Sequence, residues 1–240
     1  MATMPPSRPA DADFFNSLIE VDPEYARACA GLAATYERSL WYSAWDSGGM
    51  DARDAATRFA QKAVMLDDTD SHPHVILAWV HQLHREFDLA RRHLDRALAL
   101  NPNDADCLAN RGMILNSQGS PEEGGKWIEA AMRLNPHHPD WYLCFLGASY
   151  FLTGEYEKMI DLMERVPEGL PEVRALLAAA YAHVDRPAEA RQHLDEFLRT
   201  YSLHWSGAPS AGSVTAVFSF KRPEDAERLR AGLRKAGPPE

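Results

Sequence analysis

The sequence has no uninterrupted apolar stretch near the roughly 20 residues that a membrane-spanning helix requires, and its opening segment MATMPPSRPADADFF lacks the apolar core of a signal peptide. It also lacks an excess of basic charge, because 25 Lys and Arg stand against 35 Asp and Glu, for a formal net charge of −10. Nucleic-acid binding needs a concentrated basic face. We therefore expect a cytoplasmic protein that binds neither membranes nor nucleic acid.

Cysteine is scarce, with Cys29, Cys107 and Cys144 as the only three and no Cys-x-x-Cys pair among them. Neither a disulfide framework nor a zinc ribbon is indicated. The sequence also has no Gly-rich phosphate loop, no nucleophile elbow and no His-Glu-x-x-His helix. These absences lower the expectation of an enzyme, and we predict no catalytic residue and no cofactor.

What the sequence does contain is a repeat. The triplet Leu-Asn-Pro begins at Leu100 and again at Leu134, which is 34 residues later. A constant period in this range indicates stacked structural units. Units that start at Ser71 and Ala105 align without a gap and place small residues at the same positions. These small residues are Ala78, Ala90, Ala97, Gly112, Gly124 and Ala131.

Each unit is predicted to be two helices. Apolar residues recur at intervals of three and four, as on one face of an amphipathic helix, and this period is interrupted once in mid-unit by SQGSPEE, LTGEYEK or HVDRPAE. Ser120 before Pro121, with Glu123 three residues after the serine, predicts a capping box at a helix start. Asn-Pro and Asp-Pro pairs end the units, because proline cannot donate to the preceding turn.

This pattern resembles the tetratricopeptide repeat family, whose 34-residue helix-turn-helix unit has small residues at its eighth, twentieth and twenty-seventh places, so that the paired helices approach closely. The residues that carry the resemblance are Gly112, Gly147, Ala90, Ala97, Ala131 and Ala190. The resemblance covers roughly residues 26–201. It implies an all-α fold, a right-handed α-solenoid of about five helical hairpins.

The repeat frame also divides the chain. We predict a disordered leader at 1–13, a repeat array at 14–201, a loop at 202–220, and a capping helix with a tail at 221–240. The array begins with a half unit at 14–23 and continues with units that start near residues 26, 71, 105, 140 and 171. A polar-faced cap is expected at the end because stacked units cannot bury their outer faces alone.

The first complete unit holds an insertion that contains Trp41, Tyr42 and Trp45. Two interpretations remain open. These aromatic residues extend the first helix and pack against a neighbour, or they form an exposed patch that contacts a partner, since Trp and Tyr dominate interface energetics.

The family resemblance further implies that the first helices line a concave groove that holds a protein partner. The groove residues that it implies are His72, Val75, Trp79, Gln82, Leu83, Asp106, Met113, Asn116, Trp141, Cys144, Phe151 and His183. Smaller residues at the same register are Ala109, Ser117, Ala148, Leu152, Ala175, Ala179 and Ala182. This lining is largely neutral and lacks the cations that clamp a carboxylate. An apolar or amphipathic helical peptide is therefore the expected ligand.

A metal site is the main chemical alternative. His81 and His84 are three residues apart and can share a helix face, where neutral imidazoles would suit zinc. Asp70 and Ser71, however, suit a helix cap, and His81 occupies a place where the family usually has an aromatic residue. We therefore predict no metal and keep His81 and His84 as candidates.

Three functions follow in order. The first is a non-catalytic scaffold that binds a partner peptide or helix. The second is a regulatory or dimerisation segment of a larger bacterial signalling enzyme, because FKRPEDAERLRAGLRKAGPPE and the insertion resemble the tetratricopeptide region of some bacterial class III adenylate or guanylate cyclases; this would imply a homodimer. The third is a metal-binding or catalytic protein on the same scaffold.

Overall fold

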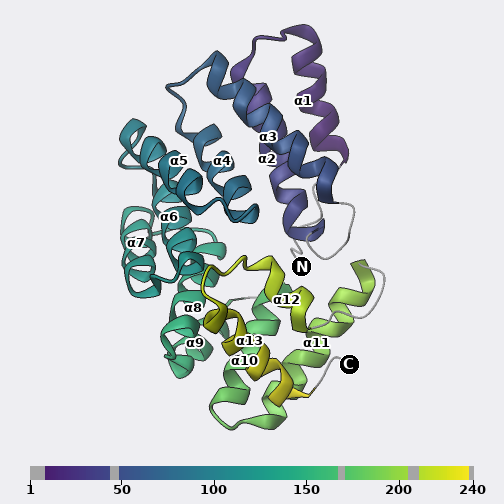
Figure 1. Cartoon of the computed structure of the whole chain (residues 1–240), viewed down its shortest axis with the longest axis vertical. Helices are drawn as coiled ribbons and strands as arrows, with labels where there is room; N and C mark the ends of the chain where they lie inside the picture. Colours follow the sequence, from purple (N-terminus) through teal and green to yellow (C-terminus); the bar gives the residue numbers. More distant parts are fainter. Residues whose placement is uncertain (1–8, 44–48, 167–170, 205–210, 238–240) are drawn as a thin grey trace. The chain divides into compact units, whose positions relative to one another are not determined.

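The computed structural model describes residues 9–43, 49–166, 171–204 and 211–237 (Figure 1). Within these ranges the chain forms thirteen α-helices and no strand. The predicted all-α fold of helical hairpins is therefore confirmed. None of the described helices is both long and apolar enough to cross a membrane. The chain forms two compact units, divided between Cys107 and Leu108, and we call them the N-terminal and the C-terminal unit.

The N-terminal unit contains five helices, in which each packs against the next. They are α1 (Pro9–Val21), α2 (Ala26–Ser43), α3 (Gly49–Leu66), α4 (Ser71–Leu83) and α5 (Phe87–Leu100). α2 also contacts α4, so the first helices of successive hairpins are neighbours. α1 begins at Pro9, inside the segment that the sequence predicts as a leader, and the Phe15 ring fills the space beside Gly31 of α2.

The C-terminal unit begins in the first turn of α6 (Ala105–Gln118). It continues with α7 (Pro121–Leu134), α8 (Trp141–Thr153), α9 (Tyr156–Met163), α10 (Pro171–His183), α11 (Pro187–His204), α12 (Ala211–Val217) and α13 (Pro223–Ala236). Consecutive helices from α7 to α11 pack together, and α8 also contacts α10. α12 lies in the stretch predicted as a loop. α13 packs on α10 and, less extensively, on α11 and α12.

Small residues set the spacing between α6 and α7. A Cβ atom added to Gly112 would lie 2.6 Å from the carbonyl oxygen of Gly124, and one added to Gly124 would lie 2.6 Å from the carbonyl oxygen of Gly112. No Cβ atom is tolerated at such a distance, so only glycine lets these backbones meet. By contrast, a Cβ on the adjacent Gly125 would be 3.5 Å from its nearest neighbour, the Cβ of Ser149, which is an ordinary contact.

The helix caps agree with the sequence at one site and differ at another. The Oδ1 atom of Asp70 accepts a hydrogen bond of 3.0 Å from the backbone N–H of His72, which confirms the predicted cap of α4. The capping box predicted at Ser120 is wrong, because Ser120 is the N-cap of α7 but its side chain makes no cap hydrogen bond. The Glu123 carboxylate instead accepts from the indole N–H of Trp127, one turn along α7, at 3.4 Å.

Three histidines join α4 to α5. The Nδ1 atoms of His74 and His93 are 3.0 Å apart. The ring of His81 stacks on that of His93, with centroids 5.3 Å apart and planes at 10°. His81 Nδ1 lies 2.6 Å from Glu86 Oε2. We call His74, His81 and His93 the histidine stack.

The proton positions in the histidine stack follow from its hydrogen bonds. Two Nδ1 atoms at 3.0 Å share one proton, so one ring donates and the other accepts. The Nε2 atom of His74 is buried and has no hydrogen-bond partner, so a proton there would be unsatisfied. Neutral His74 therefore carries its proton on Nδ1 and donates it to His93. Burial, followed by the nearby His81 and His74, lowers the pKa of His93 to about 4, and burial also lowers the pKa of His74.

The close approach of α6 and α7 yields a prediction with an internal control. Gly124→Ala should lower the free energy of unfolding by about 2 kcal/mol, because the added methyl group meets backbone that cannot move away cheaply. Gly125→Ala should leave it unchanged or raise it by up to about 1 kcal/mol, since alanine favours helix and the site has room. Urea denaturation of the full chain measures both. Equal losses for the two variants would contradict this account of the packing.

The histidine stack predicts a pH dependence. The pKa of His93 is lower in the folded than in the unfolded chain, so its contribution to stability is complete above about pH 6.5 and is lost as the pH falls toward 4. Between pH 7.5 and 5.0 the wild-type chain should lose about 2 kcal/mol more stability than the His93→Phe variant. Urea titrations at both pH values measure this difference. His72→Gln, at an exposed position of α4, is the control and should behave like wild type.

Candidate functional site

The groove residues predicted on α4, in the N-terminal unit, differ widely in exposure. Trp79 and Gln82 are buried, with 5% and 1% of their surface exposed. Val75 is largely buried, Leu83 is partly exposed, and His72 is exposed. A partner that approaches this helix would therefore meet His72 and Leu83 first.

In the C-terminal unit most of the predicted groove residues are buried. Met113, Asn116 and Phe151 all have 3% or less of their surface exposed. Asn116 has a structural role that the sequence did not reveal, since its Nδ2 donates to the carbonyl of Phe145 at 3.1 Å and its Oδ1 accepts from the Ser149 hydroxyl at 3.0 Å. These two bonds hold α6 against α8. The remaining predicted residue of α6, Asp106, precedes this unit and is exposed.

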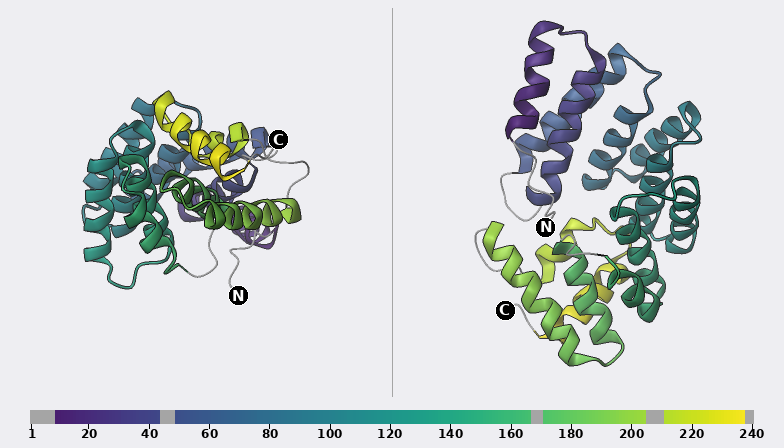
Figure 2. Two further views of the ribbon diagram at one scale, coloured as in Figure 1. Left: turned by 90° about the horizontal axis from the view of Figure 1, so that it is seen from below. Right: turned by 180° about the vertical axis from the view of Figure 1, so that it is seen from behind.

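The C-terminal helix α13 covers part of this surface. In Figure 1 and the right-hand view of Figure 2, α13 (yellow) crosses α10 (green). Gly232 of α13 is so near Ala179 of α10 that an added Cβ would lie 2.6 Å from the Ala179 Cβ. The Nε2 atom of His183 lies 2.9 Å from the carbonyl oxygen of Arg228, to which it donates. Ala179 and His183 are both predicted groove residues.

The two residues that precede α13, Lys221 and Arg222, reach α6 and the turn that follows it, two hairpins earlier in the chain. The backbone N–H of Lys221 donates to the carbonyl of Ser117 at 2.7 Å. The side chain of Arg222 lies against Gly119, whose φ of +91° already suits glycine and where a side chain would clash with that arginine. Arg222 also forms a two-pronged ion pair with the fully buried Asp225, at 2.8 and 2.7 Å. This geometry fixes the guanidinium group and leaves no buried carboxylate uncompensated.

Between these ends α13 passes the end of α8. The guanidinium of Arg228 lies 3.5 Å from the Tyr156 hydroxyl. The Tyr156 ring stacks on His183, with centroids 4.6 Å apart, and packs edge-on against Phe151 at 5.5 Å. Burial lowers the pKa of His183, which keeps this imidazole neutral at pH 7 and suited to donate one hydrogen bond to the α13 backbone.

The first half of α8 keeps an accessible aromatic surface. Trp141 and Phe145 are partly exposed, and their ring centroids are 5.0 Å apart at 64°, an edge-to-face pair. Trp141 also meets the buried Tyr142 at 4.3 Å, which fixes its position. The predicted residue Cys144 is partly exposed on the same helix. We call Trp141, Cys144 and Phe145 the α8 surface.

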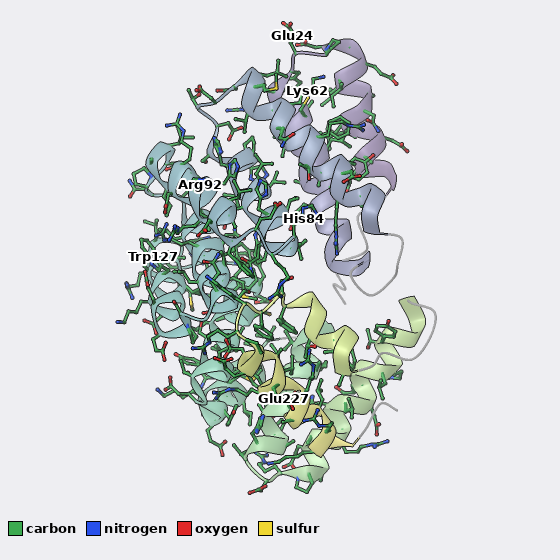
Figure 3. All side chains as sticks on the ribbon, in the orientation of Figure 1. Glu24, Lys62, His84, Arg92, Trp127 and Glu227 are labelled. Carbon is green, nitrogen blue, oxygen red and sulfur yellow. The ribbon has the colours of Figure 1, made fainter. Side chains whose placement is uncertain are left out.

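His81 and His84, the metal candidates of the sequence, lie beside one shared carboxylate. His81 is engaged by Glu86 and His93, and His84 Nδ1 lies 4.0 Å from the same Glu86 carboxylate; Figure 3 labels His84 at the end of α4. Among the described residues no group of three or more His, Cys, Asp or Glu side chains could hold a metal ion. Trp41 and Tyr42 belong to α2, but the described residues do not include their side chains, nor any part of Trp45.

Comparison with known proteins supports the repeat frame. Residues 105–138, which contain α6 and α7, match the family model described as tetratricopeptide repeat. No curated protein matches the chain.

Several solved structures are similar in fold. One is a chain of the APC/C heterotetramer Cut9–Hcn1, with a TM-score of 0.68, 18% identity, and coverage of 92% of this chain and 39% of that one. Another is pilF of Pseudomonas aeruginosa, with a TM-score of 0.55, 16% identity, and coverage of 80% and 86%. A third is yeast Tom70, with a TM-score of 0.53, 16% identity, and coverage of 94% and 46%.

The present chain spans only 39% of the length of the Cut9–Hcn1 chain that it matches. At identities of 16–18% these similarities concern the fold alone. The repeat period, the hairpins observed and the match at 105–138 nevertheless agree with one another. Residues 105–138 are a tetratricopeptide repeat, and the chain around them has the fold of tetratricopeptide-repeat proteins.

Proposed function

We propose that the chain is a non-catalytic interaction scaffold that binds an apolar or amphipathic helix of a protein partner on its first helices. The tetratricopeptide fold generally mediates protein–protein interaction. The observation that carries the proposal is the α8 surface, where Trp141 stands partly exposed and is held by Tyr142 and Phe145. A preorganised tryptophan on an otherwise neutral face is the kind of residue that anchors an interface.

The kind of partner is suggested by α13, which already packs on one of the first helices. α13 is an amphipathic helix, with Leu229 and Leu233 fully buried and charged residues such as Lys235 exposed. It packs on α10, the first helix that follows α8 among the hairpins. The groove positions supply no Lys or Arg to pair with an acidic peptide. These features favour a helix with an apolar stripe over an extended acidic tail.

The perturbed ionisable groups support a non-catalytic function. Such groups often mark an active site, but here Tyr181 and the histidine stack lie between packed helices. The Tyr181 ring stacks on His193 at 5.2 Å, and its hydroxyl donates to Glu164. Burial and this bond to Glu164 raise the pKa of Tyr181. The histidine stack has the same position between its two helices, so packing accounts for these groups.

A pair of tryptophan substitutions tests the proposal. Trp141→Ala, on the first helix α8, should weaken binding of the natural partner roughly 10-fold or more, because it removes the aromatic anchor. Trp127→Ala is the matched control, since Trp127 is also partly exposed but lies on the second helix α7 (Figure 3), where it contacts Glu123 and Arg111. Partners captured from the source cell by the full chain would be identified and their affinities measured by calorimetry.

Circular dichroism would first establish that both variants keep the helicity of the wild type. Equal binding by the Trp141→Ala variant and the wild type would contradict the proposed surface. Light scattering of the chain without a partner adds a second criterion. A doubled mass that the Trp141→Ala variant abolishes would identify the partner of this surface as a second copy of the chain.

A further inference from the structure

We propose that α12 and α13, residues 211–237, are an intramolecular ligand of the C-terminal unit, and that a partner helix of the same pattern binds in place of α13. This inference rests on the proposed function. It goes further, because it states that α13 occupies the groove and that a partner helix must compete with α13 to bind there.

The course of α13 distinguishes it from a terminal cap. A cap packs on the last hairpin, whereas this segment touches three hairpins in succession. Lys221, just before α13, meets α6 through Ser117. The middle of α13 meets the end of α8 and the start of α9 through Arg228, Gly154 and Tyr156, and its second half meets α10 through Gly232. Residues 221–236 therefore contact three successive hairpins, which is the path expected of a bound peptide.

Besides its buried leucines, α13 and the residue two places before it are held by hydrogen bonds to their backbone. His183 donates to a backbone carbonyl, that of Arg228, and Ser117 accepts from a backbone N–H, that of Lys221. The closest contact places Gly232 against Ala179, where the absence of a Cβ matters more than any particular group. A different helix with glycine at this point could make the same contacts. The required ligand is thus an amphipathic helix with Gly between two Leu-bearing turns.

The groove residue that meets α13 most closely is apolar and small. Ala179 of α10 lies against Gly232 and has no exposed surface. Release of α13 would expose part of this face, together with Leu229 and Leu233 of α13 itself. Both surfaces need a replacement partner, so an empty groove is disfavoured and exchange of one helix for another is favoured.

Covalent attachment gives α13 an advantage over a free ligand. A tethered segment acts at an effective concentration on the order of millimolar. A free helix with the same contacts and micromolar affinity would therefore compete poorly with the wild-type chain. Weakening the tethered helix by a given factor should improve the apparent affinity of the free helix by nearly that factor.

The test uses the full chain and a labelled synthetic peptide of residues 211–237 with the natural sequence. Gly232→Leu in the chain introduces a side chain where a Cβ already meets Ala179, yet leucine favours helix more than glycine does. This variant should bind the peptide at least roughly 10-fold more tightly than the wild-type chain, as measured by fluorescence anisotropy. Lys235→Leu, at an exposed position of the same helix, is the matched control and should bind like wild type.

A second variant guards against a folding defect. Leu233→Ala in the chain shortens a fully buried side chain of α13 without any clash, whereas the peptide keeps its Leu233, so this variant should also bind the peptide roughly 10-fold more tightly than wild type. If both variants keep native helicity and neither binds the peptide better than wild type, the inference is overturned. It is also overturned if both lose the C-terminal unit in one cooperative transition, because α13 is then an integral part of the core.

This experiment is independent of the natural partner. Suppose that the Gly232→Leu variant binds the peptide, but that the Trp141→Ala variant captures the natural partner as well as wild type does. The intramolecular ligand would then be supported and the α8 surface contradicted. The reverse pair of results would retain the proposed function and reject the intramolecular ligand. The two proposals therefore fail separately.

Discussion

The close approach of paired helices is the constraint on which the rest of the structure depends. Where Gly112 faces Gly124, each backbone carbonyl occupies the space that the other residue's Cβ would need. In the N-terminal unit Ala33 and Ala60 lie in one core cluster with no exposed surface. Short distances within a hairpin bring the first helices of neighbouring hairpins into contact, as with α2 and α4, and with α8 and α10. Both proposals concern the first helices of the C-terminal unit, α8 and α10 among them.

The features that could be predicted are those that depend on residues close together in the sequence. The period of small residues predicts the hairpins, and Asp70 predicts the start of α4, because these signals act within a few residues. Ser120 is the N-cap of α7 as predicted, but the capping box is absent, and the Glu123 carboxylate that it requires accepts from Trp127 one helical turn away. α12 escaped prediction because its Gly- and Ser-containing sequence has little intrinsic preference for helix, so tertiary packing such as its contact with α13 decides its conformation.

The register of the repeat located residues on the first helices, but it could not say which of them remain accessible. Accessibility depends on a segment far away in the sequence. His183 and Arg228 are 45 residues apart, and Tyr156 and Arg228 are 72 apart. No periodic signal encodes contacts over such separations. The sequence of an amphipathic helix at 223–236 has the same pattern whether the helix packs on the last hairpin alone or also reaches the preceding one. The contacts of Arg228 with Tyr156 and Gly154 distinguish the two cases.

The repeat frame explains why the polar stacks are structural. Units that start at residues 71 and 171 place His74, His81 and His93 at the same register as Arg174, Tyr181 and His193. In the second set, Arg174 donates to His193 at 3.2 Å and Tyr181 stacks on that ring at 6°. Arg174 also pairs with Glu196 at 3.4 Å. A catalytic group would need a position that opens to substrate. The same three positions therefore pair the two helices of each hairpin, although two of the three residue types differ. This recurrence indicates that the arrangement serves to join those helices.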